Sequence, residues 1–275
     1  MAAYQTITER NDRFQILDAL KRNRKKRSEL GEVFVEGIQA IKQGLESPWA
    51  VPERLLIADP GSLSDWAKNL ISSGRFPSVV RLRRELYDEL CDKAEPAELM
   101  ATFKMPRRNL GDVALPDKPL ILIFDRPSDQ GNLGTLIRSA NAFGVDLFVT
   151  HGHCADPFDP KTIRASLGAV FRTPLVHENS FEALESWLAA LKAERGLTLA
   201  GSDSEGEVEL GRAPIGRPVA LVLGNEAKGM SLRLKSILDL TVRIPMEGAV
   251  DSLNVSCAGS ILLWESARIT LAGLG

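Results

Sequence analysis

The most constraining feature of the sequence is an uninterrupted apolar run, LILIF, at residues 120–124. A strand that is apolar at every position suits the middle of a parallel sheet, where both faces are buried. Residues 219–223, VALVL, form a second apolar strand, and helical patterns at residues 133–143, 160–167 and 181–194 separate the two. Strands that alternate with helices indicate a three-layer α/β domain with a mainly parallel sheet.

The first half of the chain alternates in the same way over a shorter length. It has strand patterns at residues 33–36, 54–58, 79–82 and 99–103, separated by helical patterns at residues 37–45, 64–72 and 83–91. Residues 105–119, MPRRNLGDVALPDKP, contain three prolines and no periodicity, as expected of a linker. We therefore predict a small α/β domain at residues 1–105, a linker at 106–118 and a larger domain at 119–275.

Composition excludes several classes of protein. The apolar fraction of 44% and charged fraction of 25% are those of a globular protein. Three cysteines that lie far apart do not indicate a disulfide framework, and no apolar run is long enough for a signal core or a membrane span. We expect a cytoplasmic protein with no membrane partner. The net charge of −2 does not indicate nucleic acid, so an RNA hypothesis must rest on local patches.

One such patch is KRNRKKR at residues 21–27, with six basic residues in seven after an amphipathic helical start. A basic helix end can neutralise phosphates. The alternative is a solvated helix end whose cations complement the dipole, but six cations exceed what that requires. Two further cations near strand ends are candidate phosphate contacts. The predicted RNA-binding residues are Lys21, Arg22, Arg24, Lys25, Lys26, Arg27, Lys161 and Arg164.

The stretch IPMEGAVDSLNVSCAGSILLWE, at residues 244–265, predicts a ligand site. A strand end is followed by a polar turn and a helix that Ser252 or Asn254 can cap. A strand end, turn and capped helix form the usual ligand position in an α/β protein. The helical spacing of Leu253, Cys257, Ile261 and Trp264 predicts one buried face.

Three other sequence patterns do not predict a functional site. The turn at residues 131–134 has G-x-x-G and not G-x-G-x-x-G, so a dinucleotide site is not expected. His151, His153 and Cys154 resemble a metal cluster, but no partner set with ligand spacing follows, so we expect no metal. Residues 202–211, SDSEGEVELG, read as an acidic exposed turn without chemistry.

Three motifs together carry a family resemblance. NLGTLIRSANAFG, LVLGNEAKGM and IPMEGAVDSLNVSCAGSILLWE, in this order, resemble the motifs of the SpoU (TrmH-like) branch of SPOUT methyltransferases, and DPFDPKTIRASLGAVFRTP extends the match. It covers roughly residues 118–270, and the first domain resembles an L30e-like substrate-binding domain. Gln130 and Ala227 depart from the proline and glycine frequent there. The resemblance implies a SPOUT domain with a C-terminal trefoil knot that methylates a ribose 2′-hydroxyl in RNA from S-adenosylmethionine.

The resemblance also implies site residues. Those expected to bind the cofactor are Leu223, Gly224, Ile244, Met246, Leu253 and Ser256. Those expected at the reacting ribose are Asn132, Arg138, Glu226, Ser252 and Asn254. Arg138 matches an arginine often proposed as the catalytic base. Because a guanidinium stays protonated in proteins, we expect Arg138 instead to orient the 2′-hydroxyl, stabilise its developing alkoxide and grip the adjacent phosphate.

The implied partners are RNA and a second copy of the chain. The family resemblance implies a homodimer in which Arg138 of one subunit reaches toward the cofactor pocket of the other. The additional N-terminal domain favours ribosomal RNA over transfer RNA. The alternatives are a transfer-RNA methyltransferase and a non-catalytic RNA-binding assembly factor that retains the fold. Intact Asn132, Arg138, Glu226 and Asn254 argue against loss of catalysis.

Overall fold

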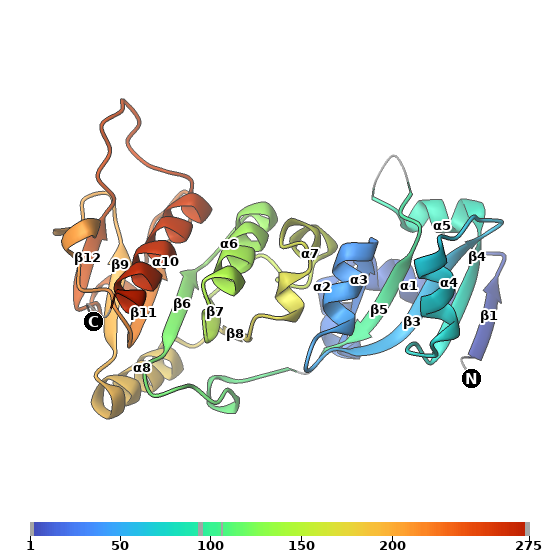
Figure 1. Cartoon of the computed structure of the whole chain (residues 1–275), viewed down its shortest axis with the longest axis horizontal. Helices are drawn as coiled ribbons and strands as arrows, with labels where there is room; N and C mark the ends of the chain where they lie inside the picture. Colours follow the sequence, from blue (N-terminus) through green and yellow to red (C-terminus); the bar gives the residue numbers. More distant parts are fainter. Residues whose placement is uncertain (1–2, 93–95, 106, 273–275) are drawn as a thin grey trace. The chain divides into compact units, whose positions relative to one another are not determined.

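The computed structural model describes residues 3–92, 96–105 and 107–272. Contacts divide the chain into two compact units, and Figure 1 labels their helices and strands where there is room. Unit 1 comprises Met1–Arg107 together with Asp156–Arg172, and unit 2 comprises Arg108–Ala155 and Thr173–Gly275. By these contacts the segment 156–172 joins the unit that contains the first predicted domain, although its sequence lies within the second. The predicted domain ends at residues 1, 106 and 275 lie outside the described residues.

Unit 1 is built on a five-stranded mixed sheet. Its order is β1 (Ala3–Ile7), β4 (Ser78–Arg83), β3 (Val51–Asp59), β5 (Met100–Lys104) and β2 (Glu32–Glu36). The first three strands are parallel, and β5 runs antiparallel to both of its neighbours. Strand β1 was not predicted because only its last residue, Ile7, is buried, so its sequence has no clear apolar pattern.

Helices cover both faces of this sheet. One core cluster joins Phe14 and Leu17 of α1 (Asp12–Arg22) to Leu86 of α5 (Arg84–Leu90) and to strand residues such as Leu82. On the opposite face, Phe103 of β5 packs against Phe171 of the short helix η2 (Ala169–Phe171). There α3 (Ile38–Leu45) brings Gly44 so close that a Cβ would meet the Phe103 ring. The remaining helices of unit 1 are α2 (Arg24–Leu30), α4 (Asp65–Ser72) and α7 (Pro160–Ala165).

Unit 2 is built on a seven-stranded sheet whose neighbouring strands are all parallel. Its order is β10 (Val208–Glu209), β12 (Leu240–Arg243), β9 (Thr198–Ser202), β11 (Val219–Leu223), β6 (Leu120–Asp125), β7 (Leu147–His151) and β8 (Leu175–Glu178). Every residue of β6 and β11 is buried, which confirms the parallel α/β prediction for these two runs. The four-residue β8 and two-residue β10 are too short to give a sequence pattern.

Unit 2 has three layers. Helices α8 (Phe181–Arg195) and α9 (Leu232–Lys235) share a core cluster with Ile121, Ile123 and Val222 on one face of the sheet. Leu223 points to the opposite face because side chains alternate along a strand. There α6 (Gln130–Ala142) packs against α10 (Val255–Leu271). Gly259 of α10 permits this approach, since a Cβ would lie 2.5 Å from Leu136 and 2.6 Å from Leu223.

The predicted buried face of α10 is wrong. Leu253, Cys257, Ile261 and Trp264 are all exposed, Trp264 by 55%. The buried side is instead formed by Ser256, Gly259, Leu262, Leu263, Glu265, Ser266 and Ile269. Small and polar residues form part of this contact, so hydrophobic spacing pointed to the wrong side of the helix. Among the described residues, no helix combines the length and apolar character that a membrane span requires.

Candidate active site

A pocket of about 450 Å³ lies at the carboxyl ends of β9, β11 and β12 in unit 2. Ser202 ends β9, Leu223 ends β11 and Ile244 follows β12 directly. Loops at the carboxyl ends of parallel strands are where α/β proteins bind ligands, and this volume is typical of a small-molecule site. The lining residues are Asn132, Ser202, Asp203, Ser204, Leu223, Gly224, Asn225, Glu226, Gly229, Met230, Ile244, Met246, Ser252, Leu253, Asn254, Val255 and Ala258.

One wall of the pocket is a tight turn after β11. The amide of Asn225 donates to the carbonyl of Gly229 at 3.0 Å, and the Gly229 amide donates back at 2.9 Å. Gly224 lies directly against this turn, because a Cβ there would be 2.2 Å from the Met230 nitrogen and 2.4 Å from the Gly229 carbonyl carbon. Both contacts are with backbone, so only glycine fits this position.

The N-terminus of α10 forms another wall. Its N-cap is Asn254, whose Oδ1 accepts hydrogen bonds from the amides of Ser256 and Cys257. Asn254, and not Ser252, is therefore the cap. The Ser256 hydroxyl also donates to Asn254 Oδ1, at 2.6 Å, and Ser256 is buried and outside the lining. The Ser256 side chain therefore serves the cap, and the expectation that Ser256 binds the cofactor stays a prediction.

Hydrogen bonds join residues from the three sequence motifs. Glu226 Oε2 accepts from the hydroxyl and amide of Ser128, at 2.7 and 3.1 Å. Glu226 Oε1 accepts from Asn132 Nδ2 at 3.4 Å, and Asn254 Nδ2 donates to Asn132 Oδ1 at 2.8 Å. Asn132 is therefore the link between the turn after β11 and the start of α10.

These hydrogen bonds also determine the charge of Glu226. Burial on its own raises the pKa of the Glu226 carboxyl, but hydrogen bonds from the Ser128 hydroxyl and from the Ser128 and Asp129 amides outweigh burial and lower the pKa. The side chain is a carboxylate at neutral pH and can only accept hydrogen bonds. Glu226 therefore holds the two turns together.

Arg138 lies apart from the pocket. It is exposed on α6 and does not line the pocket, and its side chain makes no hydrogen bond or ion pair within the described part of the chain. The adjacent Ser139 hydroxyl is 2.7 Å from the Ser260 hydroxyl, where α6 meets α10. Within the described residues of one copy, Arg138 is thus a free cation on the helix that packs against α10.

Several pocket residues were missed by the sequence reading. Ser202, Asp203 and Ser204 line the pocket, although the stretch 202–211 was expected to carry no chemistry. These three residues reach the pocket because the stretch begins at the carboxyl end of β9, which brings them beside Gly224. Asp203 pairs with Lys235 at 2.6 Å. The sequence signal for these pocket residues was their position directly after the β9 strand pattern. The acidic composition of the stretch obscured that signal.

The basic run divides between buried and exposed residues. Arg27 is only 4% exposed, and its guanidinium donates to Asp156 at 2.7 Å, to Asp159 at 3.1 Å and to backbone carbonyls of α1. Lys21 is buried and pairs with Asp92 at 2.7 Å. The RNA-binding prediction is therefore wrong for Arg27 and Lys21, because their charges are already paired with acidic side chains of the same unit.

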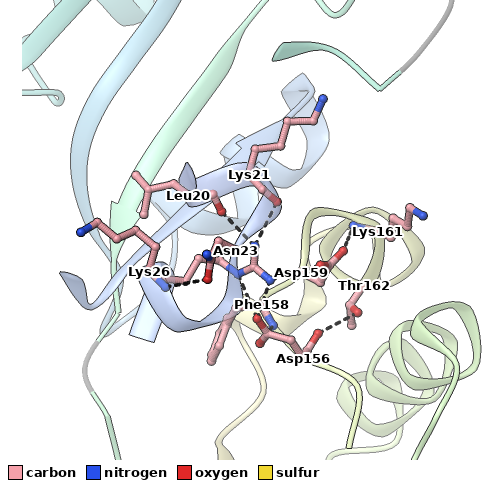
Figure 2. A network of polar contacts seen from close by, with 10 residues as sticks. Leu20, Lys21, Asn23, Lys26, Asp156, Phe158, Asp159, Lys161 and Thr162 are labelled. Carbon is pink, nitrogen blue, oxygen red and sulfur yellow. Dashed lines mark hydrogen bonds and ion pairs between the residues drawn. The ribbon is translucent and has the colours of Figure 1, made fainter. Parts of the chain in front are cut away.

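The exposed part of the run comes from a helix break that the sequence reading did not anticipate. The Asn23 side chain accepts from the Lys26 amide and caps α2. Arg22, which precedes this break, is exposed. After the break, Arg24 and Lys25 are exposed and Lys26 is half-buried. Figure 2 shows the amino groups of Lys26 and Lys161 directed away from Asp156 and Asp159. Arg164 instead lies 3.6 Å from Glu36 and 3.5 Å from Asp92.

The histidine-rich stretch has ordinary contacts. His151 Nδ1 lies 2.9 Å from the Glu178 carbonyl oxygen, and Cys154 Sγ lies 3.5 Å from His177 Nδ1. His153 is exposed. Within residues 3–92, 96–105 and 107–272, no three His, Cys, Asp or Glu side chains form a group suited to a metal.

Comparison with known proteins identifies the family of this fold and site. The chain matches the SpoU rRNA Methylase family over residues 119–264 and the SpoU L30e-like domain over residues 11–101. The chain belongs to the SpoU rRNA methylase family. A 23S rRNA (uridine(2479)-2′-O)-methyltransferase of Streptomyces viridochromogenes is 36% identical over 98% of this chain and 94% of that protein. The 23S rRNA (guanosine(2553)-2′-O)-methyltransferase RlmP of Bacillus subtilis is 30% identical over 88% and 91%.

A solved structure agrees in fold. The SpoU methyltransferase AviRb from Streptomyces viridochromogenes, in complex with AdoMet, superposes with a TM-score of 0.88 at 36% identity, over 94% of this chain and 98% of that one. Both the family resemblance and the SPOUT fold are thereby confirmed. This SpoU family member is an RNA ribose-2′-O-methyltransferase whose cofactor is S-adenosylmethionine.

The pocket fits this cofactor. Apolar side chains of Leu223, Ile244 and Leu253 line it together with polar ones of Ser252 and Asn254, a combination suited to a ligand with an apolar ring and charged ends. The bare backbone at Gly224 brings peptide groups to the pocket surface. These residues would hold the cofactor.

Proposed function

We propose that this enzyme methylates a ribose 2′-hydroxyl in 23S ribosomal RNA, with residues 1–105 selecting the target and residues 119–275 performing the transfer. The observation that carries the proposal is the match along both domains to relatives named 23S rRNA 2′-O-methyltransferases. A shared N-terminal domain supports a shared class of RNA. Action on ribosomal RNA supports a cytoplasmic location.

The chemistry divides between the cofactor and the protein. Bound S-adenosylmethionine supplies an electrophilic methyl group for an in-line displacement. The chain's residues must hold the ribose oxygen in line and stabilise the charge that develops on it. Asn132, Ser252 and Asn254 provide polar groups at the pocket. Arg138 supplies the cation for the developing alkoxide and the adjacent phosphate.

The position of Arg138 favours a homodimer with shared active sites. Cys257, Ile261 and Trp264 form an exposed face on α10, which a second copy can cover. Arg138 lies on α6, which packs against α10, and it is not used by its own pocket. In this arrangement Arg138 of one subunit completes the site of the other.

The RNA surface of unit 1 comprises Arg22, Arg24, Lys25, Lys26 and Lys161. All but the half-buried Lys26 are exposed. Lys25 and Lys26 form surface pairs with Glu29, at 3.9 and 3.6 Å, and such pairs are weak enough to exchange for phosphates.

We also propose the family's trefoil knot. After β12 the chain returns past β9 and β11 as α10, to pack against α6. This path supports a threaded C-terminal segment.

Methyl transfer to purified RNA tests the proposed function. The protein should transfer labelled methyl to unmodified 23S rRNA at one nucleotide, and the product should resist alkaline hydrolysis there because the 2′-oxygen is blocked. Small-subunit rRNA and transfer RNA should take up little label. Labelling of transfer RNA alone would favour the transfer-RNA alternative. Tight RNA binding without transfer to any of these RNAs would favour the assembly factor.

A further inference from the structure

Arg126 follows β6 directly and has a backbone conformation unusual for its residue type. Its φ is 53°, in the left-handed region that residues other than glycine rarely adopt. The neighbouring Gly152 makes room for it, since a Cβ at Gly152 would lie 2.9 Å from Arg126 Cγ. An unfavourable conformation that neighbouring residues accommodate is a reason to look for a function.

The side chain and backbone of Arg126 both contact the turn that forms a pocket wall. Arg126 Nη2 donates to the Gly229 carbonyl at 3.0 Å, and Asn225 Nδ2 donates to the Arg126 carbonyl at 2.7 Å. These bonds join residues 99 and 103 positions apart in sequence. Arg126 therefore contacts both ends of the turn 225–229 but does not line the pocket.

Asp125 holds the Arg126 side chain in place. It is fully buried, and its Oδ2 accepts from Arg126 Nε at 3.1 Å, from Arg126 Nη2 at 2.9 Å and from the Ser231 amide at 2.8 Å. Leu223 pairs with Phe124 in the sheet, so Asp125 lies beside Gly224. The carbonyl of Gly229 and the amide of Ser231, on either side of Met230, are both fixed by this ion pair.

We propose that Arg126, held by Asp125, is a positioning residue that determines the affinity for S-adenosylmethionine. Gly224 and Met230 line the pocket and lie in contact, so a movement of residues 229–230 changes the pocket surface directly. Arg126 touches neither cofactor nor RNA. Its removal loosens the wall that binds the cofactor and leaves the ribose-binding groups in place. The inference rests on the cofactor and not on the identity of the RNA.

The test compares Arg126→Met with Arg217→Met. Arg217 makes similar contacts near the other end of the sheet, with the Asp146 carboxylate and the Gly144 carbonyl, and does not line the pocket. Arg126→Met should weaken calorimetric S-adenosylmethionine binding by about tenfold and raise its KM similarly. The kcat at saturating cofactor and the KM for RNA should change by less than about threefold. Arg217→Met should leave cofactor binding unchanged.

Arg126→Lys provides a second variant in case Arg126→Met does not fold. Lysine keeps the charge but lacks the fork that joins Asp125 to Gly229, so it should also bind S-adenosylmethionine several-fold more weakly. Hydrogen exchange of residues 225–231 should be faster in either folded variant and unchanged in Arg217→Met. Wild-type cofactor affinity in a folded Arg126 variant, or equal losses in the Arg126 and Arg217 variants, would overturn the proposal.

Discussion

At the scale of single residues, the pocket depends on a few side chains that satisfy the polar groups of its turns. Glu226 accepts hydrogen bonds from the turn before α6, and Asn132 and Asn254 continue the chain of contacts to α10. An acceptor-only carboxylate suits this task because its partners are all donors. The effect of pH follows from this arrangement.

We expect the stabilisation by Glu226 to disappear in acid. The pKa of Glu226 is lower in the folded protein than its ordinary value, which is about 4.3. The carboxylate therefore stabilises the fold above that pH, and this contribution is lost as pH falls through the folded-state pKa. Thermal unfolding should show a larger Tm difference between wild type and Glu226→Gln at pH 7 than well below pH 4. A difference that is constant across this range would contradict the assigned role.

Arg138→Ala should separate binding from catalysis. Since Arg138 lies outside the pocket of its own chain, calorimetric affinity for S-adenosylmethionine should stay within about twofold of wild type. Methyl transfer should fall by about a hundredfold or more, because the variant lacks a cation aimed at developing charge. Transfer at a near wild-type rate would remove Arg138 from the mechanism.

Motifs located the contacting residues better than their detailed roles. Asn132, Glu226 and Asn254 were predicted by motif and do meet in the structure. The bond from the Ser256 hydroxyl to Asn254 could not be predicted, because sequence spacing does not show which way a first-turn hydroxyl points. The contribution of Arg126 had no sequence signal, since it arises from a backbone conformation and from partners about a hundred residues away.

At the scale of elements, α2 and the segment 156–172 are joined by Arg27. Breaking a buried ion pair from one side leaves uncompensated carboxylates, which costs about 3 kcal/mol or more. Arg27→Ala should therefore lower the free energy of unfolding by about that amount. Lys25→Ala, in the same helix but exposed, should change it by less than about 0.5 kcal/mol. If denaturant titrations show equally small changes in the free energy of unfolding for the two substitutions, the ion pairs of Arg27 do not stabilise the fold.

The exposed cations of α2 should contribute to RNA binding instead. Lys25→Ala with Lys26→Ala should weaken RNA binding, and each phosphate that is no longer neutralised should reduce the slope of log affinity against log salt by roughly 0.7 to 0.9. Lys68→Ala is a control, since Lys68 is an exposed helical lysine of the same unit that pairs with Asp65. A slope that is the same in the double variant as in the control would assign α2 to an ordinary solvated surface.

Sequence patterns predicted elements best where burial was uniform. The fully buried β6 and β11 were located to within a residue, whereas β1 and β8 have few buried residues and were missed. The helix break at Asn23 follows from a side chain that caps α2 in place of continuing α1. Hydrophobic spacing on α10 identified its exposed face, because the surface proposed to meet a second copy is apolar as well.

At the scale of the whole molecule, the proposed mechanism requires two copies of the chain. Each copy has a pocket without Arg138 and an apolar face on α10. A twofold assembly that covers this face explains both features at once. The central claim is therefore that methyl transfer takes place in a site to which both subunits contribute.

Complementation between two inactive variants tests this claim most directly. Arg138→Ala and Asn254→Ala should each be inactive as homodimers, and they should be co-expressed and their mixed dimers confirmed by mass. In a shared-site dimer, one site carries both defects and the other carries neither. Random pairing makes about half of the dimers mixed, so roughly a quarter of wild-type activity should return. If mixed dimers form and no activity returns, each site is complete within one subunit and the shared-site mechanism is contradicted.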